Sequence, residues 1–449
     1  MTTPEENTRL TRVGKGTPMG SLMRRYWTPA CIATELVAGG APVRIALLGE
    51  RLVGFRSPDG TVGIFDQACP HRCASLFLGR NEEGGLRCVY HGWKFDTSGK
   101  CVDAPNLPPD FQVADRVRAR AYPTLELGGV IWAYLGEGDP PPPPAIEALL
   151  LPADQVRVSA SFRRCNWLQV LEGDIDTSHF GFLHSGSVDA DMVDPDDMHS
   201  LSIIDRAPRY HVTETDWGTM YAAHRVAPND QTYWRVAQYL VPFWTMFPDG
   251  DFAQNIVANA AVPMDDEHTM IFLWIHAKRT TGLRQLKDGS PIVGLHRDED
   301  YLPNGTGWFE RWRSVAQPDN DWLIDREVQA NESFSGMIGV QLQDQAVTES
   351  MGAVVDRSRE FLTPSDRMIA VTRRRILRLL AAHEKGELDP PGVGNPEVTQ
   401  GARSGAYLAP AAQDWLEAYE TQLRKANDPT GVLQSRMELK ECEEPLAPG

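Results

Sequence analysis

The first third of the chain alternates short apolar runs with turn residues, as small β-sheet domains do. Within residues 42–66, turn signals stand at Gly49–Glu50 and Pro58–Gly60, and the apolar runs beside them have strand length. Residues 128–136, GGVIWAYLG, predict a further buried strand. Long helical periodicity is missing from this stretch of sequence, so we expect an all-β domain.

A proline run, Pro140–Pro144, follows the last of these strands directly. Polyproline is stiff and extended and lacks the N–H groups that a strand ladder needs, so it cannot continue a sheet. We therefore predict a first domain at residues 1–139, which includes an N-terminal extension, and a second domain at residues 140–449. A chain of 449 residues is also long for a single core.

The second domain mixes helical and strand periodicity, which predicts an α+β fold with an antiparallel sheet and helices. We expect residues 165–184 to be helical and residues 281–320, rich in Gly, Pro and Asp, to form a long loop. Strands are expected at 209–225, 232–246, 253–263 and 269–279.

Residues 365–387 predict an amphipathic helix that Ser365 or Asp366 could cap. Its apolar stripe consists of Ile369, Ile376, Leu377 and Leu380. The run Arg373–Arg375 is expected to lie on the solvated face of this helix.

The chain is acidic, with 44 basic and 61 acidic residues and a formal net charge of −17. This charge argues against a general nucleic-acid binder, which would carry a basic face. It does not exclude an anionic substrate, because a few local arginines decide that. The N-terminus has no apolar signal region, and no run approaches the ~20 apolar residues of a membrane helix, so we expect a cytoplasmic protein.

Two short motifs concentrate metal-binding side chains in the first domain. Cys69 and His71 form C-x-H, Cys88 and His91 form C-x-x-H, and sixteen residues separate His71 from Cys88. Two Cys and two His suit a tetrahedral zinc or a [2Fe–2S] cluster. Each motif supplies one Cys and one His in strand-like surroundings, as two facing hairpin tips would, and this favours the cluster.

The segments CPHR and CVYHGW at these positions resemble the Rieske iron–sulfur motif. The resemblance implies that Cys69, His71, Cys88 and His91 hold a [2Fe–2S] cluster that passes one electron at a time. With four positions filled, Cys73 and Cys101 are expected to be small buried residues and not ligands.

A second constellation lies in the next domain, where Asp176, His179 and His184 have the spacing D-x-x-H-x-x-x-x-H. On a helix or a distorted helix these side chains can lie near one face. Two His and one later carboxylate form the facial triad of non-haem Fe(II) oxygenases, which leaves positions open for O2 and substrate. The later candidates for this carboxylate are Asp344, Glu349 and Asp356.

Together the two constellations resemble the oxygenase (alpha) subunit of Rieske non-haem iron aromatic ring-hydroxylating oxygenases. The segments GTPMGSLMRRYW and QDQAVTESMGAVVDRS are similar to those of the phthalate dioxygenase branch. The resemblance implies a helix-grip (START-like) catalytic domain, with Asp344 as the third iron ligand and Glu349 as the runner-up. It also implies that Asp176 bridges His179 to His91 of the partner subunit.

The same resemblance implies the reaction and its participants. Electrons from NAD(P)H would arrive through a separate flavin/iron–sulfur reductase, and O2 would be the co-substrate at Fe(II). The expected assembly is a homotrimer or a stacked hexamer. The expected substrate is an aromatic acid such as a phthalate or a substituted benzoate, which would be dioxygenated or monooxygenated.

Two other functions stay open. One is oxidative O-demethylation of a lignin-derived methoxy aromatic acid. The other is electron transfer by a Rieske protein without oxygenase activity, although such a carrier has no use for an open iron site. Four arginines could anchor an acidic substrate, and three aromatic residues could wall its pocket, although core packing is the expected role of most of these three. They are Arg206, Arg209, Arg225 and Arg235, and Trp234, Phe243 and Trp244.

Overall fold

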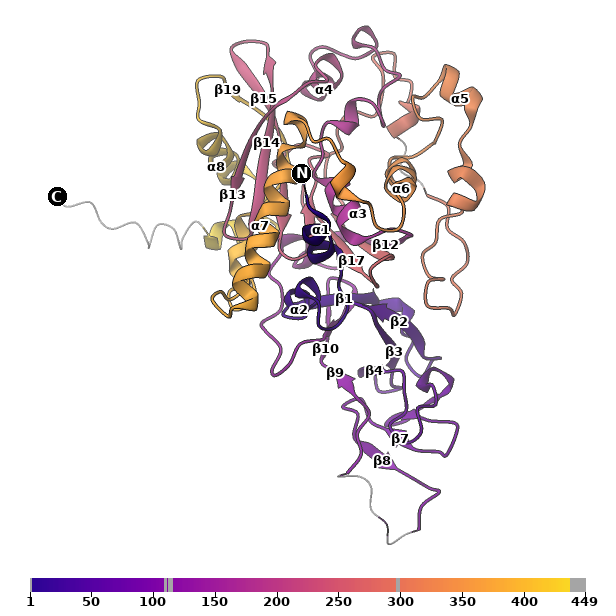
Figure 1. The fold of residues 1–449 in the computed structure, drawn as a ribbon. Coiled ribbons are helices and arrows are strands. Elements are labelled where there is room, and N and C mark those ends of the chain that lie inside the picture. Colours follow the sequence, from indigo (N-terminus) through magenta and orange to yellow (C-terminus); the bar gives the residue numbers. More distant parts are fainter. Residues whose placement is uncertain (1, 109–110, 112–115, 296–298, 437–449) are drawn as a thin grey trace, which may run out of the picture.

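The computed structural model describes residues 2–108, 111, 116–295 and 299–436, and Figure 1 shows a narrow β part below a larger α+β part. The β part contains two small antiparallel sheets, which confirms the strands expected in residues 42–66. One sheet consists of β2 (Val43–Leu47), β3 (Glu50–Arg56), β4 (Val62–Asp66) and β9 (Ala121–Tyr122). The other consists of β5 (Arg80–Glu82), β6 (Gly85–Arg87), β7 (Lys94–Phe95) and β8 (Cys101–Asp103).

A three-stranded sheet joins the two parts. It consists of β1 (Trp27–Ile32), β11 (Val130–Tyr134) and β10 (Thr124–Leu127), in the order β1-β11-β10. The indole of Trp132 on β11 stacks on Trp244 and Trp274 of the larger part, with both ring centroids 5.8 Å away. The hydrophobic core is therefore continuous between the two parts. The division into domains at residue 139 stays a prediction.

Two N-terminal helices that the pattern did not predict, α1 (Pro4–Thr11) and α2 (Pro18–Met23), also belong to this junction. Both pack against the long helix α7 (Arg367–Glu384) of the larger part. Leu10 and Leu22 contribute to the same core cluster as the strands of the larger sheet. The N-terminal extension therefore buttresses the larger part, although the chain passes from it into the β part.

An antiparallel sheet, eight-stranded within the described residues, dominates the larger part in the order β12-β18-β17-β16-β15-β14-β13, with β19 also pairing with β15. Two of the four predicted strands are split by turns, at residues 215–217 and 241–243, and two strands, β12 and β19, were not predicted. The strands are β12 (Val156–Arg163), β13 (Arg209–Glu214), β14 (Gly218–Ala227), β15 (Gln231–Leu240), β16 (Trp244–Met246), β17 (Val257–Pro263), β18 (Thr269–His276) and β19 (Gly405–Pro410). Residues 281–320 are largely irregular where the structure describes them, as expected.

Helices cover both faces of this sheet. The predicted amphipathic helix is confirmed as α7, which packs on β13 and β14 and buries Ile376 and Leu380 (Figure 1). On the opposite face, Met220 and Ala222 of β14 and Trp234 and Val236 of β15 pack on α8 (Trp415–Lys425). Because side chains alternate between the faces of a strand, the odd-numbered positions of β14 and β15 lie on the α7 side.

One basic residue of α7 is buried, contrary to the sequence expectation. Arg373 is 5% exposed and donates to Glu172 on α3 (Trp167–Asp174), with Nε 2.5 Å from Oε1. The fully buried Arg357 donates to the same carboxylate, with Nη2 2.9 Å from Oε2. Burial by itself would raise the pKa of Glu172, but the two guanidinium groups outweigh burial and lower it. This ionic cluster ties α3, which leads into the functional site, to α7.

Replacing Glu172 by Gln is expected to destabilise the fold by about 3–5 kcal/mol, because it leaves two buried guanidinium groups without their carboxylate. The lowered pKa means that this contribution is present at neutral pH and is lost as the pH falls through the folded-state pKa, below 4.5. Chemical denaturation at pH 7 measures it. Glu360→Gln is the matched control, because Glu360 pairs with Arg373 but is 24% exposed, and its effect should be much smaller. Equal effects would contradict a special role for Glu172.

Candidate active site

The two Cys/His motifs form two loops with the same backbone hydrogen bonds. In the first loop the N–H of Cys69 donates to the carbonyl of Ala74 at 2.9 Å, and in the second the N–H of Cys88 donates to that of Trp93 at 2.8 Å. The residue four positions after each of these Cys donates back to its carbonyl. The loops are therefore equivalent hairpin tips, each offering one Cys and one His.

The Cys and His side chains of the two tips lie close together. Both thiols are 2% exposed, and the rings of His71 and His91 lie 4.4 Å apart, with His71 stacked on Trp93. The Nδ1 atom of His91 is buried and has no hydrogen-bond partner in the described chain. Burial, with the neighbouring Cys88, raises the pKa of Cys69 to about 11. Positively charged iron between the loops would remove this penalty and would employ the orphaned imidazole nitrogen.

Cys73 differs from the sequence expectation, because it is exposed and not buried. It occupies in the first loop the position that Gly92 occupies in the second, and both have a positive φ, +57° and +78°. Its N–H donates to the carbonyl of Cys69, so the residue closes the turn. Cys101 is buried, as expected, with its thiol 3.6 Å from the carbonyl of Asp103.

The segment expected to be helical at 165–184 is helical only at its start. Helix α3 ends at Asp174, and a short 3₁₀ turn covers His179–Gly181. Asp176 causes the change of direction, since its Oδ1 accepts hydrogen bonds from the N–H and the hydroxyl of Ser178 at 2.8 and 2.7 Å. Such a local side-chain bond competes with the helical ladder. The break places His179 and His184 on a compact loop.

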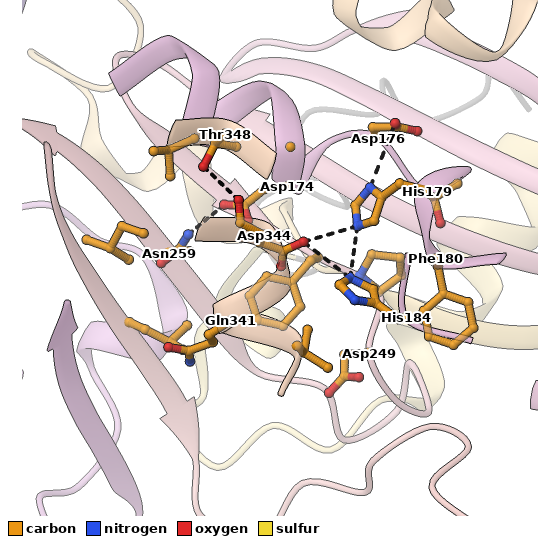
Figure 2. Close-up of a pocket in the computed structure, with 18 of the residues that line it drawn as sticks. Asp174, Asp176, His179, Phe180, His184, Asp249, Asn259, Gln341, Asp344 and Thr348 are labelled. Carbon is orange, nitrogen blue, oxygen red and sulfur yellow. Dashed lines mark hydrogen bonds and ion pairs between the residues drawn. The ribbon is translucent and has the colours of Figure 1, made fainter. Parts of the chain in front are cut away.

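This loop meets helix α6 (Val340–Ser350), and Figure 2 shows His179, His184 and Asp344 turned toward one point. The Nε2 atoms of His179 and His184 are 3.1 Å apart. Oδ1 of Asp344 lies 3.6 Å from Nε2 of His179 and 3.3 Å from Nε2 of His184. All donor atoms lie within 4.8 Å of one another. One ion with bonds of about 2.0–2.2 Å can reach all three, so the set fits a single divalent cation.

The charges around these groups favour a cation. Burial would lower the pKa of His179, but Asp176 and Asp344 outweigh burial and raise it. Burial would likewise raise the pKa of Asp344, but the imidazoles of His184 and His179 lower it. The field that stabilises an imidazolium here also stabilises a metal ion in its place. Two imidazoles and one carboxylate are the donor set of non-haem Fe(II) sites.

Asp176, for which the resemblance implies a bridging role, lies behind His179. Its Oδ2 is 3.7 Å from Nδ1 of His179 (Figure 2). Strands β7 and β8 lie at the end of the β part farthest from α3 and α6 (Figure 1). The Cys/His loops beside these strands are therefore remote from Asp176 within one chain.

The other carboxylates considered as iron ligands are used elsewhere. Glu349 accepts from the N–H of Arg164 and the indole of Trp322, both at 2.8 Å. Asp356 is exposed and accepts from the N–H of Ser358. Of the three candidates, only Asp344 lies beside the two histidines.

A cavity opens beside the three metal-site residues, and Arg235 on β15 lines it. Arg235 is 9% exposed, and its Nε has no hydrogen-bond partner within the described residues. Arg225 on β14 is 4% exposed, on the same face of the sheet, and its Nη1 is also unpartnered. Burial, reinforced by Arg235, lowers the pKa of Arg225 to about 10. The structure thus buries two cations, neither of which forms an ion pair with a described carboxylate.

The other arginines and aromatics named from the sequence have different roles. Arg206 covers the ring of Phe182 and donates to the carbonyl of Val188, and Arg209 is exposed. All three aromatics are core residues, with Trp234 on the α8 side and Phe243 and Trp244 in the main core, as expected.

Two polar residues of the site, Asp174 and Gln343, were not predicted from the sequence. Asp174 lines the cavity and accepts from Thr245 at 2.6 Å and Asn259 at 2.5 Å, and burial raises its pKa to about 6 (Figure 2). Gln343 contacts the back of His184, with Oε1 2.6 Å from Nδ1. Neither residue belongs to a recognised motif. Their only indication in the sequence is that Asp174 lies two residues before Asp176 and that Gln343 lies next to Asp344.

Comparison with known proteins gives matches along nearly the whole chain. Residues 26–123 match the family described as Rieske [2Fe-2S] domain, and residues 133–439 match LigXa C-terminal domain like. The oxygenase subunit of 3-chlorobenzoate-3,4-dioxygenase from Comamonas testosteroni is 51% identical over 94% of this chain and 99% of that protein. The phthalate 4,5-dioxygenase oxygenase subunit of Pseudomonas putida is 37% identical over 92% and 93%.

A third relative is the oxygenase subunit of 5,5'-dehydrodivanillate O-demethylase from Sphingobium sp., 32% identical over 88% of this chain and 84% of that protein. Among solved structures, dicamba monooxygenase bound to dicamba has the same fold, with a TM-score of 0.54 at 20% identity over 81% of this chain and 98% of that one.

Proposed function

The chain belongs to the Rieske non-haem iron oxygenases as an oxygenase subunit, and on this premise we propose that it hydroxylates an aromatic acid. The observation that carries the substrate class is Arg235, a buried arginine on the wall of the cavity beside the three metal-site residues, which forms no ion pair with a described carboxylate. A buried cation without a partner is costly, and a substrate carboxylate would complete it.

In this proposal Cys69, His71, Cys88 and His91 hold the [2Fe–2S] cluster, and His179, His184 and Asp344 hold one Fe(II). When bound, the iron supplies open coordination positions at which O2 is activated beside the substrate. The chain's own contribution is to orient the ligands, to hold the substrate in the cavity and to exclude bulk water from it.

Arg235 is the proposed anchor of the substrate carboxylate. It lies on the cavity wall, where its guanidinium is 4.9 Å from the centre of the Phe180 ring, and Phe180 adjoins the ligand His179. A carboxylate held there would leave the aromatic ring in the remaining cavity, toward the metal site. The two other arginines that line the cavity have carboxylate partners, because Arg284 donates to Asp249 at 2.6 Å and Arg163 lies 3.9 Å from Glu299.

The reaction is proposed to be dioxygenation or monooxygenation of the ring. Relatives at 51% and 37% identity carry the names of a chlorobenzoate and a phthalate dioxygenase, which supports this choice. Oxidative O-demethylation of a methoxy aromatic acid is the second candidate, because a relative at 32% identity is named as an O-demethylase.

The test is oxygen uptake by the anaerobically reconstituted protein with a surrogate reductase. Substituted benzoates, phthalates and methoxybenzoates form the panel, and the corresponding amides are matched controls without charge. Uptake with acids and not with amides supports the proposal. Product mass separates gain of two oxygens, gain of one, and loss of a methyl group. No oxidation of any acid, with both metal centres loaded, would contradict it.

Arg235→Gln is expected to raise KM for an aromatic acid by about 10- to 150-fold, because the substrate carboxylate loses a hydrogen bond from a charged group. The change in kcat should be smaller. Steady-state kinetics with the best acid of the panel measure it. Arg284→Gln is the control, because its partner Asp249 also pairs with Arg279 at 2.8 Å. Equal KM for the Arg235 variant and the wild type would exclude Arg235 as the anchor.

The assembly is proposed to be a homotrimer, or two stacked trimers, in which the cluster of one subunit serves the iron of the next. Two observations support this head-to-tail arrangement. The loop beside His91 exposes Val89 (53%) and Tyr90 (52%), and the surface beside His179 exposes Phe182 (50%) and Phe334 (52%). Different patches at distant places on one chain can pair head to tail, and such contacts generate a ring when the rotation between neighbouring subunits closes.

The proposed partner in electron supply is a separate flavin/iron–sulfur reductase that uses NAD(P)H, and the proposed location is the cytoplasm. The described cysteines form no disulfide, which suits a reducing compartment. Where the chain is described, it has no helix of sufficient length and hydrophobicity to cross a bilayer.

A further inference from the structure

Gln343 lies directly behind one of the two imidazoles of the proposed iron site. It precedes Asp344 on α6, its side chain is fully buried, and its Oε1 is 2.6 Å from Nδ1 of His184. The other imidazole has Asp176 at the equivalent nitrogen, at 3.7 Å. The two histidines are therefore held from behind by different groups, one by a carboxylate and one by an amide.

The orientation of this amide follows from its other contacts. Its Nε2 lies 2.8 Å from the carbonyl oxygen of Met337 and 3.0 Å from the hydroxyl of Ser335. A backbone carbonyl can only accept, so the amide NH2 must face Met337 and the amide oxygen must face His184. The oxygen in turn can only accept, so Nδ1 of His184 must carry the proton.

We propose that Gln343 is a positioning residue that fixes the tautomer and the ring plane of His184 and so presents its Nε2 as a metal ligand. A proton at Nδ1 leaves the lone pair at Nε2, which faces Nε2 of His179 at 3.1 Å and Asp344 at 3.3 Å. The amide does this without adding a second negative charge behind the ligands. Partners in this position typically affect metal affinity by about 10- to 100-fold.

The test compares Gln343→Leu, which removes the acceptor at similar volume, with the wild type. Co(II) affinity of the iron-free protein is measured anaerobically by competition with a chelator, so the readout does not depend on turnover. We expect the affinity to fall by about 10- to 100-fold, because the ring is no longer held in one tautomer. Gln343→Glu keeps an acceptor oxygen beside Nδ1 but loses the donor to the carbonyl of Met337, so it should recover part of the affinity.

Gln345→Leu is the matched control on the same helix. Gln345 is also buried, but its amide donates to the carbonyl of Ala316 and to Glu349, and it contacts neither histidine. It should lower thermal stability without changing Co(II) affinity. The proposal is overturned if Gln343→Leu binds Co(II) as tightly as the wild type, or if Gln345→Leu weakens binding equally. Because it rests on the proposed iron site, a wild-type protein that takes up no Co(II) would contradict that site itself.

Discussion

Replacement of Asp344 by Ala is expected to empty the proposed iron site and to abolish substrate oxidation. Asp344 supplies the only carboxylate within reach of both imidazoles in the described structure, at 3.6 and 3.3 Å. Without it the site loses both a ligand and the negative charge that compensates a divalent cation. The iron affinity should fall by more than about 100-fold, which is the largest loss typical of removing a group that only hydrogen-bonds to a metal ligand.

Iron analysis separates the two metal centres in this variant, because the cluster contributes two irons with acid-labile sulfide and the mononuclear site one iron without it. We expect the sulfide content and the cluster absorption to stay at wild-type level. Glu349→Gln is the control, since Glu349 was the alternative ligand and accepts from Arg164 and Trp322 instead. That variant should retain its iron and lose stability. Iron loss from Glu349→Gln and not from Asp344→Ala would reverse the assignment.

Asp176→Asn is expected to keep both metal centres and to slow coupled turnover by about 100-fold or more, since it changes a carboxylate that orients a metal-ligating imidazole. The substitution preserves shape and leaves an oxygen to accept from Ser178. It removes the negative charge 3.7 Å from Nδ1 of His179 and the proposed acceptor for His91 of the partner subunit. Stopped-flow absorption should show normal reduction of the cluster but slow reoxidation with substrate and O2 present. Normal reoxidation would contradict the bridge.

Co-assembly tests whether this bridge lies between subunits. Chains with Asp176→Asn keep an intact cluster, and chains with Cys88→Ser keep an intact Asp176 and iron site. In mixed rings the cluster of the first chain faces the bridge of the second, so activity should recover above that of either variant alone. If electrons passed within one chain, every chain would lack one part and the mixture would stay inactive.

The chemistry of both constellations could be predicted from the sequence because their members are either adjacent or of rare type. Cys69 and His71, and likewise Cys88 and His91, stand within short turns, and local spacing decides that they share a loop tip. His179 and His184 are five residues apart on one compact loop. Asp344 is distant in sequence from both histidines, and the family resemblance selected it over Glu349. In the structure Glu349 accepts a hydrogen bond from Trp322 instead.

Local pattern misled where long-range contacts override it. The position of Arg373 in the helical pattern predicts a solvent-exposed side chain. The structure buries it, because it pairs with Glu172, which lies about 200 residues earlier in the chain. The helix expected through residue 184 ends at Asp174, because the Asp176 carboxylate bonds to Ser178 in place of the helical ladder. Strand β12 pairs with β18 across more than 100 residues and was not predicted.

The sequence by itself therefore determined the fold class, the residues proposed to hold the metals and the family. Only the tertiary structure decided which arginines are buried without an anionic partner and which amide holds His184. The physical reason is that ligand chemistry resides in residue type and short spacing, which a sequence displays directly. Burial, unpaired charge and hydrogen-bond orientation depend on which strands and helices meet, and those contacts join Arg235 to the cavity and Gln343 to an imidazole 159 residues away.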